Sequence, residues 1–467
     1  MKIPFLMLLI FLLGSSACEP ATLSSLEPLQ QGVGLDLGPW VTLLGADPFR
    51  VCVSWLSARR ENATLAFSIN STNLSRSLDA QRDGALHRAC LNLLPGETLF
   101  YRPESRRHPF GDTIFSMTVP EPGLPLHLVV LGDIQPVDDR TQESARMMLD
   151  RVREEAPDWV VQCGDSLQNG SELISWERLL TVLPRLAAGT PMALVPGNHD
   201  LRYDDGISWA AGFWQEFETG LDRRHRVLRH PRIRLFLLDA FYGPLSERDF
   251  AWLEKELADA RRAGLWRFVF FHGSILSSGM ENTDTELQRQ LVPLLDRHRV
   301  HAVFYGHDHM FEHYEVTYGP WVFSADDEPS GEPIHYFLTG GGGARLEFEY
   351  GLLERPVTTS EATYHNIDTG EDRTFHFERR PWDDGRINEL AEPAWSPGGA
   401  AYFHDCTTAC YQDDAGFWGQ HYGENVLHYL TLDVSAEEAV VTARYPDGSV
   451  MSGPDGMNPQ TWRILRE

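Results

Sequence analysis

The chain has 467 residues, of which 42% are hydrophobic and 23% are charged, so it is long enough for two or three globular domains. Its 67 acidic residues outnumber its 40 basic ones and give a formal net charge of -27. So acidic a surface argues against a nucleic-acid-binding groove. A bound metal could still create a local cationic site that attracts anions.

The N-terminus is typical of an export signal. Met1 and Lys2 precede an apolar run at 3–13, which is too short to span a bilayer, and small residues then lead into Cys18. Residues 1–18 are therefore predicted to be a signal peptide. It would be either of the bacterial lipoprotein type, with a lipid anchor at Cys18, or of the plain secretory type, with cleavage near Ala17. The predicted location is periplasmic, outer-membrane lipoprotein or extracellular, and that anchor is the only membrane contact expected.

An exported chain can oxidise its cysteines. Cys52 and Cys90 each lie in a predicted strand, so a cross-strand disulfide is expected if these strands are neighbours. Cys406 and Cys410 could close a small loop. Cys163, inside an apolar strand, is predicted to be a buried free thiol.

Residues 19–120 are predicted to form a small β-sandwich that carries no catalytic cluster. Short alternating runs separated by turn-rich pieces lie at 51–55, 64–69, 88–93, 98–101 and 114–119. The Pro-rich piece at 120–125 is the best domain boundary. The second domain is therefore predicted to span 121–467.

In this second domain, strands alternate with helical stretches, which is typical of an α/β layered fold. One amphipathic helix is expected at 247–260, with Ser246 and Asp249 as a capping box. Apolar strands are expected at 128–131, 159–161, 192–195, 233–238, 268–271 and 302–305. In such sheets, ligands bind at the carboxyl ends of the strands.

The last third of the chain is predicted to be β-rich again, with an interruption. Strands are expected at 313–317 and 334–339, the second leading into the glycines 340–343, and closing strands at 426–434 and 439–445. Residues 345–425 between them are predicted to be an irregular insertion, rich in aromatic residues. This insertion is either a lid that sets specificity or a surface insertion packed by its own aromatics.

Polar motifs follow five of the apolar runs. They are Asp133-Ile134-Gln135, Gly164-Asp165, Gly197-Asn198-His199-Asp200, His272 and Gly306-His307-Asp308-His309. Their carboxylates, imidazoles and amide oxygens suit Mn, Fe or Zn rather than Ca or a thiolate site. Two carboxylates against at least three neutral imidazoles leave a pair of divalent metals strongly positive, which suits a site that holds a phosphoryl group and a hydroxide together.

In order and spacing these motifs resemble the calcineurin-like metallophosphoesterase superfamily, over about residues 127–344 and again at the closing hairpin. The domain layout is similar to that of purple acid phosphatases. The resemblance implies an α/β fold, with an α/β/β/α metallophosphoesterase-type sandwich preceded by an N-terminal fibronectin-III-like β-sandwich. It also implies two divalent or trivalent metal ions, Mn, Fe or Zn, as cofactors.

The resemblance implies a role for each motif residue. His199 would contact the phosphate and protonate the leaving oxygen, and Asp200 would orient or polarise His199. The implied metal ligands are Asp133, Gln135 and His309 for the first ion, Asn198, His272 and His307 for the second, and Asp165 as the bridge.

The chain departs from the family pattern at two positions. Many members have histidine where this chain has Gln135, so the first metal receives a weaker amide ligand or none. Purple acid phosphatases have a tyrosine ligand where this chain has Gln168, so there is no reason to expect a purple, ferric-locked site. The glycines 340–343 either line the site or form only a tight turn.

The function implied is that of an exported dinuclear-metal phosphoesterase, which hydrolyses phosphomonoesters by attack of a metal-bound hydroxide. Its partner would be a phosphorylated small molecule or another phosphoester substrate. A phosphodiesterase or nucleotide pyrophosphatase is the alternative, because the same metal pair serves both reactions. The alternative of another class is a non-catalytic surface-binding protein.

Overall fold

The computed structural model describes most of the chain between residues 36 and 466. The stretches that it does not describe are 1–35, 47–48, 58–61, 84–85, 106–109, 122–124, 171, 202–220, 242, 278–283, 317–332, 347–359, 366–371, 381–389, 394–417, 425, 453–458 and 467. The predicted signal peptide, Cys18, Cys406 and Cys410 therefore lie outside the described residues. No helix within the described ranges is both long enough and apolar enough to cross a membrane.

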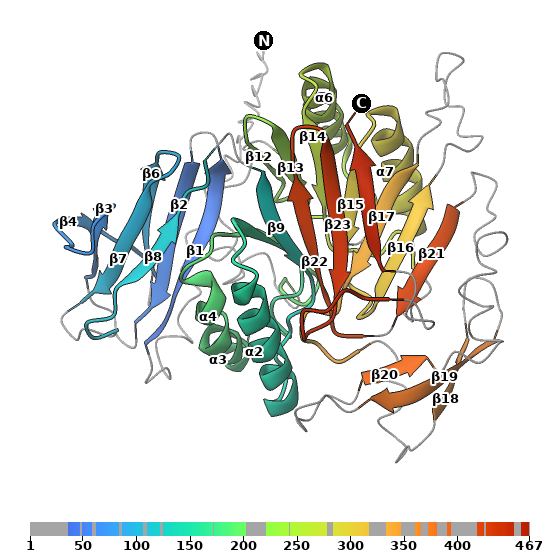
Figure 1. The fold of residues 1–467 in the computed structure, drawn as a ribbon, viewed down its shortest axis with the longest axis horizontal. Coiled ribbons are helices and arrows are strands. Elements are labelled where there is room, and N and C mark those ends of the chain that lie inside the picture. The colour runs from blue at the N-terminus through green and yellow to red at the C-terminus, as the bar shows by residue number, and fades with distance from the viewer. Residues whose placement is uncertain are drawn as a thin grey trace, which may run out of the picture.

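A ten-stranded sheet contains both the first described strands, from β1 on, and the last one, β24 (Figure 1). Strand β1 pairs in parallel with β11 at Thr42 and Met192. The sheet therefore continues across the predicted domain boundary at residue 120. Its strands, in spatial order, are β24 (Thr461–Leu465), β23 (Glu438–Arg444), β22 (Tyr429–Val434), β9 (Leu126–Leu131), β10 (Trp159–Cys163), β11 (Met192–Val195), β1 (Leu37–Ala46), β2 (Phe49–Leu56), β6 (Leu86–Leu93) and β5 (Gln81–Asp83).

A separate four-stranded sheet completes the N-terminal region, at the left of Figure 1. It consists of β4 (Arg76–Asp79), β3 (Thr64–Ile69), β7 (Thr98–Glu104) and β8 (Phe115–Thr118), in that spatial order. The hydroxyl of Tyr101 in β7 donates a hydrogen bond of 2.6 Å to the carbonyl of Ala188 in the second domain. The described strands between residues 37 and 118 agree with the predicted all-β character. The fibronectin-III-like assignment and the 19–120 boundaries stay predictions.

A seven-stranded sheet faces the first one and belongs wholly to the later part of the chain. Its strands, in spatial order, are β12 (Arg226–Arg229), β13 (Ile233–Leu237), β14 (Trp266–Phe270), β15 (Ala302–Tyr305), β17 (Ile334–Thr339), β16 (Phe311–Val316) and β21 (Trp418–Glu424). Side chains alternate between its two faces, as the period of a strand requires. Phe268 and Phe270 enter the core shared with the first sheet, whereas Val269 and Phe271 enter a second core.

Helices cover the outer face of each sheet. α6 (Glu247–Arg262) and α7 (Thr285–Arg297) contribute Leu253 and Leu291 to the second core. α2 (Asp139–Glu154), α3 (Leu173–Val182) and α4 (Pro184–Ala187) pack on the first sheet, and α2 contributes Met148 to the shared core. The layers are therefore helix, sheet, sheet, helix, which confirms the predicted mixed α/β fold of the second domain.

Strands also occur in the segment that was predicted to be irregular. β18 (Ser360–His365), β19 (Asp372–Arg380) and β20 (Leu390–Pro393) form a three-stranded sheet, and β21 joins the seven-stranded sheet beside β16. The interpretation of 345–425 as irregular is therefore corrected for these four stretches.

The predicted helix α6 begins where expected, but its capping box is only half formed. The hydroxyl of Ser246 accepts a hydrogen bond of 3.2 Å from the amide of Asp249. The carboxylate of Asp249 does not return to the cap. It accepts from the amide of Asp222 at 2.8 Å and lies 3.3 Å from Nε2 of His225. Asp249 thereby fixes the segment before β12 against the helix.

The cysteine predictions that the described residues can test are confirmed. Cys52 and Cys90 lie directly opposite each other in β2 and β6 and form a disulfide, with their Cα atoms 4.0 Å apart. Cys163 is a buried free thiol at the end of β10, and burial raises the pKa of this thiol well above its usual value.

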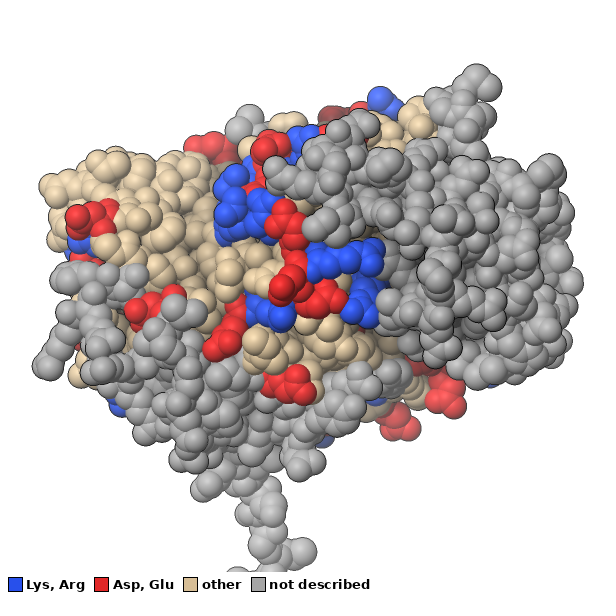
Figure 2. Space-filling model, turned by 90° about the horizontal axis from the view of Figure 1, so that it is seen from below, with Lys and Arg blue, Asp and Glu red and all other residues tan. Residues whose placement is uncertain are grey.

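The face that carries α2 to α4 shows charges of both signs side by side (Figure 2). Asp150 is the centre of this group, because Arg146, Arg153 and Arg185 each place a guanidinium nitrogen within 3.3 Å of its carboxylate. These arginines therefore lie in ion pairs with an acidic partner.

Candidate metal centre

The five predicted motifs meet where the two sheets approach each other. Asp133, Asp165 and Asn198 follow β9, β10 and β11 of the first sheet, while His272 and His307 follow β14 and β15 of the second. These strands run parallel within each sheet, so their carboxyl ends share one edge. Backbone hydrogen bonds connect the two edges, among them Gly132 N to Thr339 O at 2.8 Å.

The backbone turns sharply at these positions. Seven non-glycine residues in the described part of the chain have a positive φ, and four of them are predicted ligands: Asp133 (56°), Gln135 (26°), Asp165 (51°) and His307 (80°). Side chains rarely adopt this left-handed conformation, which persists only where the surroundings fix it. Backbone strain is therefore concentrated at the predicted site.

Two glycines allow the close approach of neighbouring loops. A Cβ at Gly197 would overlap the carboxylate of Asp165, and a Cβ at Gly306 would overlap that of Asp133. Glycine is the residue that lets a backbone pass so near another group. Both acidic groups thus lie directly against the main chain of a different motif.

His272 is held between three oxygen atoms. Its Nδ1 donates to the carbonyl of Cys163 at 2.9 Å, so Nε2 is the nitrogen that faces Oδ1 of Asn198 at 2.8 Å and Oδ2 of Asp165 at 3.3 Å. Burial lowers the pKa of His272, but Asp165 and Asp133 outweigh it and raise the pKa to about 10. Two oxygens directed at one ring nitrogen need a cation between them, either a proton or a metal ion.

His307 completes this group as a neutral imidazole. Burial and the nearby His272 lower its pKa to about 3. One ligand atom each of Asp165, His272 and His307 lie within 4.8 Å of one another, the spacing of residues that share a metal ion. Asp165 stays ionised because His272 and the other imidazoles overcome its burial and lower its pKa.

The residues predicted for the first metal also lie together. His309 donates from Nδ1 to the carbonyl of Arg345, and its Nε2 lies 3.5 Å from Oδ1 of Asp133. Gln135 donates from Nε2 to Oδ2 of Asp165 at 2.8 Å. Its Oε1 is then a buried acceptor without a hydrogen-bond partner. Such an oxygen is costly to bury unless a cation or donor meets it, so the donor set fits a metal ion here.

His199 is positioned by two loops. Its amide donates to Oδ1 of Asp165 at 2.8 Å, and its Nδ1 donates to the carbonyl of Gln168 at 2.8 Å. Because a carbonyl can only accept, Nδ1 carries a proton, and Nε2 is the ring nitrogen that this bond leaves for other contacts.

Asp200 accepts hydrogen bonds from the backbone of two loops. Its two carboxylate oxygens accept from the amides of Leu167 at 3.0 Å and Gly197 at 2.9 Å. Burial, reinforced by the charge of Asp165, raises the pKa of Asp200 well above its usual value. These hydrogen bonds join the loop of Leu167 to that of Gly197. The role implied for Asp200, to orient or polarise His199, stays a prediction.

The comparison with known proteins agrees with this geometry. Residues 126–311 match the model of the calcineurin-like phosphoesterase family. This segment, about 40% of the chain, is similar to calcineurin-like phosphoesterases. Purple acid phosphatase 22 of Arabidopsis thaliana is 22% identical over 332 residues, which cover 67% of this chain and 72% of that protein. Acid phosphatase type 7 of Mus musculus is 26% identical over 231 residues, which cover 46% of this chain and 48% of that protein.

Solved structures support the fold of the phosphoesterase. The purple acid phosphatase PPD1 from yellow lupin seeds superposes with a TM-score of 0.61 at 15% identity and covers 93% of this chain and 75% of its own. PhoD superposes with a TM-score of 0.55 at 10% identity and covers 93% of this chain and 92% of its own. The family match and the curated relatives identify a metal-dependent phosphoester hydrolase, and this family implies a dinuclear metal centre.

Several residues that support the site of the phosphoesterase escaped the sequence analysis. Arg345 offers its carbonyl to His309 and pairs through its guanidinium with Asp138, the N-cap of α2, at 2.5 Å. His428, directly before β22, contacts the hydroxyl of Thr339 at 3.1 Å. The contacts made by Arg345 and Gln168 through backbone carbonyls leave no signal in the residue type.

The glycines 340–343 of the phosphoesterase do lie at the centre. A Cβ at Gly340 would come within 3.1 Å of Oδ2 of Asp133, and the amide of Gly342 donates to the carbonyl of Gly132 at 2.9 Å. Of the two interpretations, the one in which this run lines the site is therefore correct.

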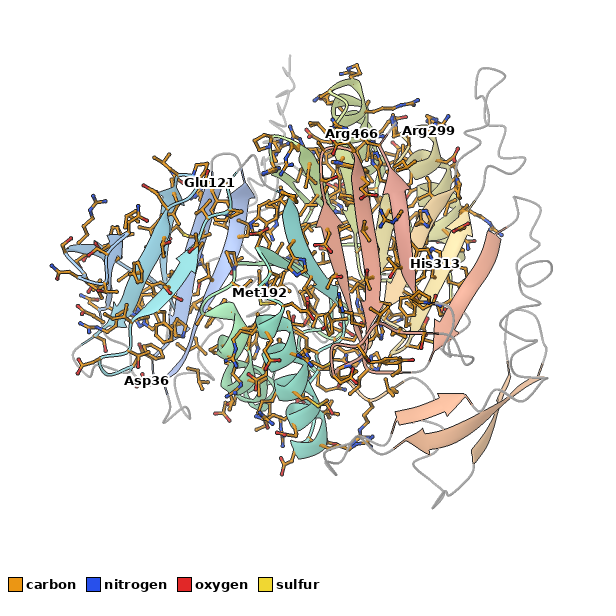
Figure 3. The ribbon with its side chains drawn as sticks, viewed as in Figure 1. Asp36, Glu121, Met192, Arg299, His313 and Arg466 are labelled. Atoms are coloured by element: carbon orange, nitrogen blue, oxygen red, sulfur yellow. A yellow bond between two sulfur atoms is a disulfide. The ribbon has the colours of Figure 1, made fainter. Side chains whose placement is uncertain are left out.

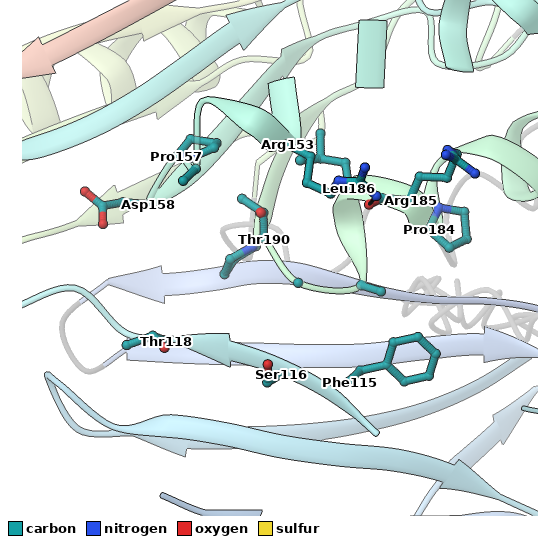
Figure 4. A pocket seen from close by; sticks show the side chains of 14 residues that line it. Phe115, Ser116, Thr118, Arg153, Pro157, Asp158, Pro184, Arg185, Leu186 and Thr190 are labelled. Carbon is teal, nitrogen blue, oxygen red and sulfur yellow. Dashed lines mark hydrogen bonds between the residues drawn. The ribbon is translucent and has the colours of Figure 1, made fainter. Parts of the chain in front are cut away.

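A hollow of about 650 Å³ lies elsewhere, at the seam between the N-terminal strands and the catalytic sheets (Figure 4). Phe115 and Thr118 of β8 line one side, and Arg153, Asp158 and Thr190 line the other. None of the predicted metal ligands lines this hollow.

Proposed function

We propose that this phosphoesterase is exported and hydrolyses phosphomonoesters. The observation that carries the proposal is the position of His199, whose ring is fixed by Gln168 while its amide is fixed by the central carboxylate of Asp165. The imidazole of His199 is thereby held against the cluster of ligands. Support for a monoester comes from relatives that are named as acid phosphatases.

Seven residues would hold the metal pair. Asp133, Gln135 and His309 would form one side, Asn198, His272 and His307 the other, with Asp165 between them. When bound, the ions supply a nucleophile from water and neutralise the charge of the phosphoryl group. The protein contributes the orientation of each ligand, since His272 and His309 both donate Nδ1–H to a backbone carbonyl and so direct Nε2 to a carboxylate.

His199 would protonate the leaving oxygen. Its Nδ1–H is bound to Gln168, so the proton that moves is the one on Nε2. Asp200 holds the amides of Leu167 and Gly197, which flank the two loops that carry Asp165 and His199. The acid is therefore kept in place by backbone contacts.

The activity is tested with p-nitrophenyl phosphate and bis(p-nitrophenyl) phosphate, each with Mn, Fe, Zn or Co added. A monoesterase should turn over the first substrate with a higher kcat/KM than the second. The reverse preference would assign the site to phosphodiesters, and no turnover with any of the metals would refute the proposed reaction. Mass spectrometry of the mature protein tests export, since retention of residues 1–18 would contradict it.

A further inference from the structure

A second group of potential ligands lies on β16 and β17, away from the centre described above. It consists of His313, Glu315 and His335, and one ligand atom from each lies within 4.8 Å of the others. His335 is four residues before Thr339 along β17, which corresponds to roughly 13 Å in a strand. The group is therefore distinct from the site that follows Thr339.

The strand pairing explains why these side chains meet. His313 and Glu315 are two residues apart on β16 and so share one face of the sheet. In the antiparallel register, Glu315 lies opposite His335, and His313 lies opposite Phe337, the next residue of β17 on that face. His335 is thus the direct neighbour of Glu315 and the diagonal neighbour of His313.

The ligand atoms already have a spacing that suits a small cation. Nε2 of His313 lies 3.0 Å from Nδ1 of His335, and that nitrogen lies 3.8 Å from Oε1 of Glu315. In a tetrahedral zinc site with metal–ligand bonds of about 2.0–2.1 Å, two ligand atoms are roughly 3.3 Å apart. The two observed distances bracket this value.

Aromatic rings pack against one side of the group, and the other side is partly exposed to solvent. His313 is fully buried, and its ring lies 4.3 Å from that of Trp462 on β24 and 4.8 Å from that of Phe337, measured between ring centroids. The side chains of His335 and Glu315 are 12% and 29% exposed. A cation could therefore enter from solvent past Glu315 and meet an imidazole that aromatic packing holds in place. Figure 3 shows His313 on the side of the molecule away from the N-terminal strands.

We propose that His313, Glu315 and His335 form a separate binding site for a divalent cation of the zinc type. Two imidazoles and one carboxylate are the ligands that Zn²⁺ accepts, and water can complete the tetrahedron. The site joins β16 to β17, which connect to the catalytic centre at His309 and Gly340 respectively. Its role is structural, since a cation here fixes the two strands that carry these residues.

The test measures zinc content per chain by inductively coupled plasma mass spectrometry after equilibration of the full chain with buffered Zn²⁺. Glu315→Gln and His335→Gln should each remove one ion per chain. The same loss is expected in an Asp133→Asn/Asp165→Asn background, where the catalytic carboxylates are absent. Because the measurement does not depend on turnover, a failure of the proposed phosphatase activity does not affect it.

A matched control is His127→Gln, which removes another partly exposed histidine beside a carboxylate, that of Asp433. It should leave the zinc content unchanged, and circular dichroism should show that all variants are folded. Cobalt substitution gives a second measurement, since the visible absorption of tetrahedral Co²⁺ should fall in His335→Gln within the Asp133→Asn/Asp165→Asn background. Unchanged zinc in both Glu315→Gln and His335→Gln, or an equal loss in His127→Gln, would overturn the proposal.

Discussion

Asp165 connects more of the catalytic centre than any other predicted ligand. Oδ1 accepts a hydrogen bond from the backbone amide of His199. Oδ2 accepts one from the side-chain Nε2 of Gln135 and lies 3.3 Å from Nε2 of His272. It therefore touches both predicted metal sets and the predicted acid. The negative charge of Asp165 is needed to hold a cation, because the other ligands beside it in this buried group, His272 and His307, are imidazoles.

Asp165→Asn should abolish both metal binding and hydrolysis, with kcat/KM falling by a factor of about 100 or more. The amide keeps the size of the carboxylate but removes the negative charge that attracts the ions. Elemental analysis and a p-nitrophenyl phosphate assay measure the two effects. Asp158→Asn is the control, because Asp158 accepts a backbone bond from His127 away from the site. Full metal content in Asp165→Asn would contradict the bridging role.

His199→Ala should slow esters with poor leaving groups more than activated ones. A general acid contributes about 10²–10⁴-fold when the departing oxygen needs a proton, and little when it does not. Comparing an alkyl phosphate with p-nitrophenyl phosphate therefore separates acid catalysis from a general loss of structure. The metal content of the variant should equal that of the wild type. An equal loss of activity on both esters would contradict the role of His199 as the general acid.

At the scale of elements, the sequence predicted best those strands that are short, apolar and buried. The bounds of β11, β15 and β17 agree with the predicted runs. β11 and β15 are unbroken apolar stretches, and each of the three strands is followed by a glycine or polar motif. β19 was missed although Phe375 and Phe377 alternate with polar residues in it. The segment around it showed few clear periods, so it was predicted to be irregular.

Ser246→Ala should lower the free energy of unfolding by about 1 kcal/mol. The substitution removes the hydroxyl that accepts from the amide of Asp249 and so leaves the first turn of α6 without its cap. Urea denaturation measures the difference. Ser246→Thr keeps a hydroxyl at the cap and should recover most of the stability. An equal loss in both variants would show that the cap bond does not stabilise the helix.

At the scale of the whole molecule, the site depends on contacts that no local pattern contains. The motifs themselves could be predicted from the sequence, because each follows an apolar strand. In the structure, all of them lie together. The hydrogen bond between Gly132, which follows β9, and Thr339 of β17 connects the two sheets, and the pairing of Thr42 with Met192 joins the N-terminal strands to the catalytic sheet. Such pairings are set by packing of the complete chain, so sequence periodicity could not reveal them.

The closing strand β22 is fastened to β9 by a pair of side chains whose strength depends on pH. Nδ1 of His127 lies 2.7 Å from Oδ1 of Asp433. The hydrogen bond to Asp433 raises the pKa of His127 above 6.5, although burial opposes it. A folded-state pKa that is raised stabilises the protein fully below the unfolded pKa near 6.5, and this contribution is lost as the pH rises through the folded pKa.

The free energy of unfolding should therefore differ between wild type and His127→Gln at about pH 5.5 and converge at an alkaline pH above the folded pKa. Because the side chains of His127 and Asp433 are 28% and 51% exposed, solvent screening limits the difference to about 1 kcal/mol or less. Urea denaturation at both pH values measures it, and Asp433→Asn should reproduce the same pH dependence. A difference that stays constant with pH would mean that packing of the imidazole, and not its charge, holds the two strands together.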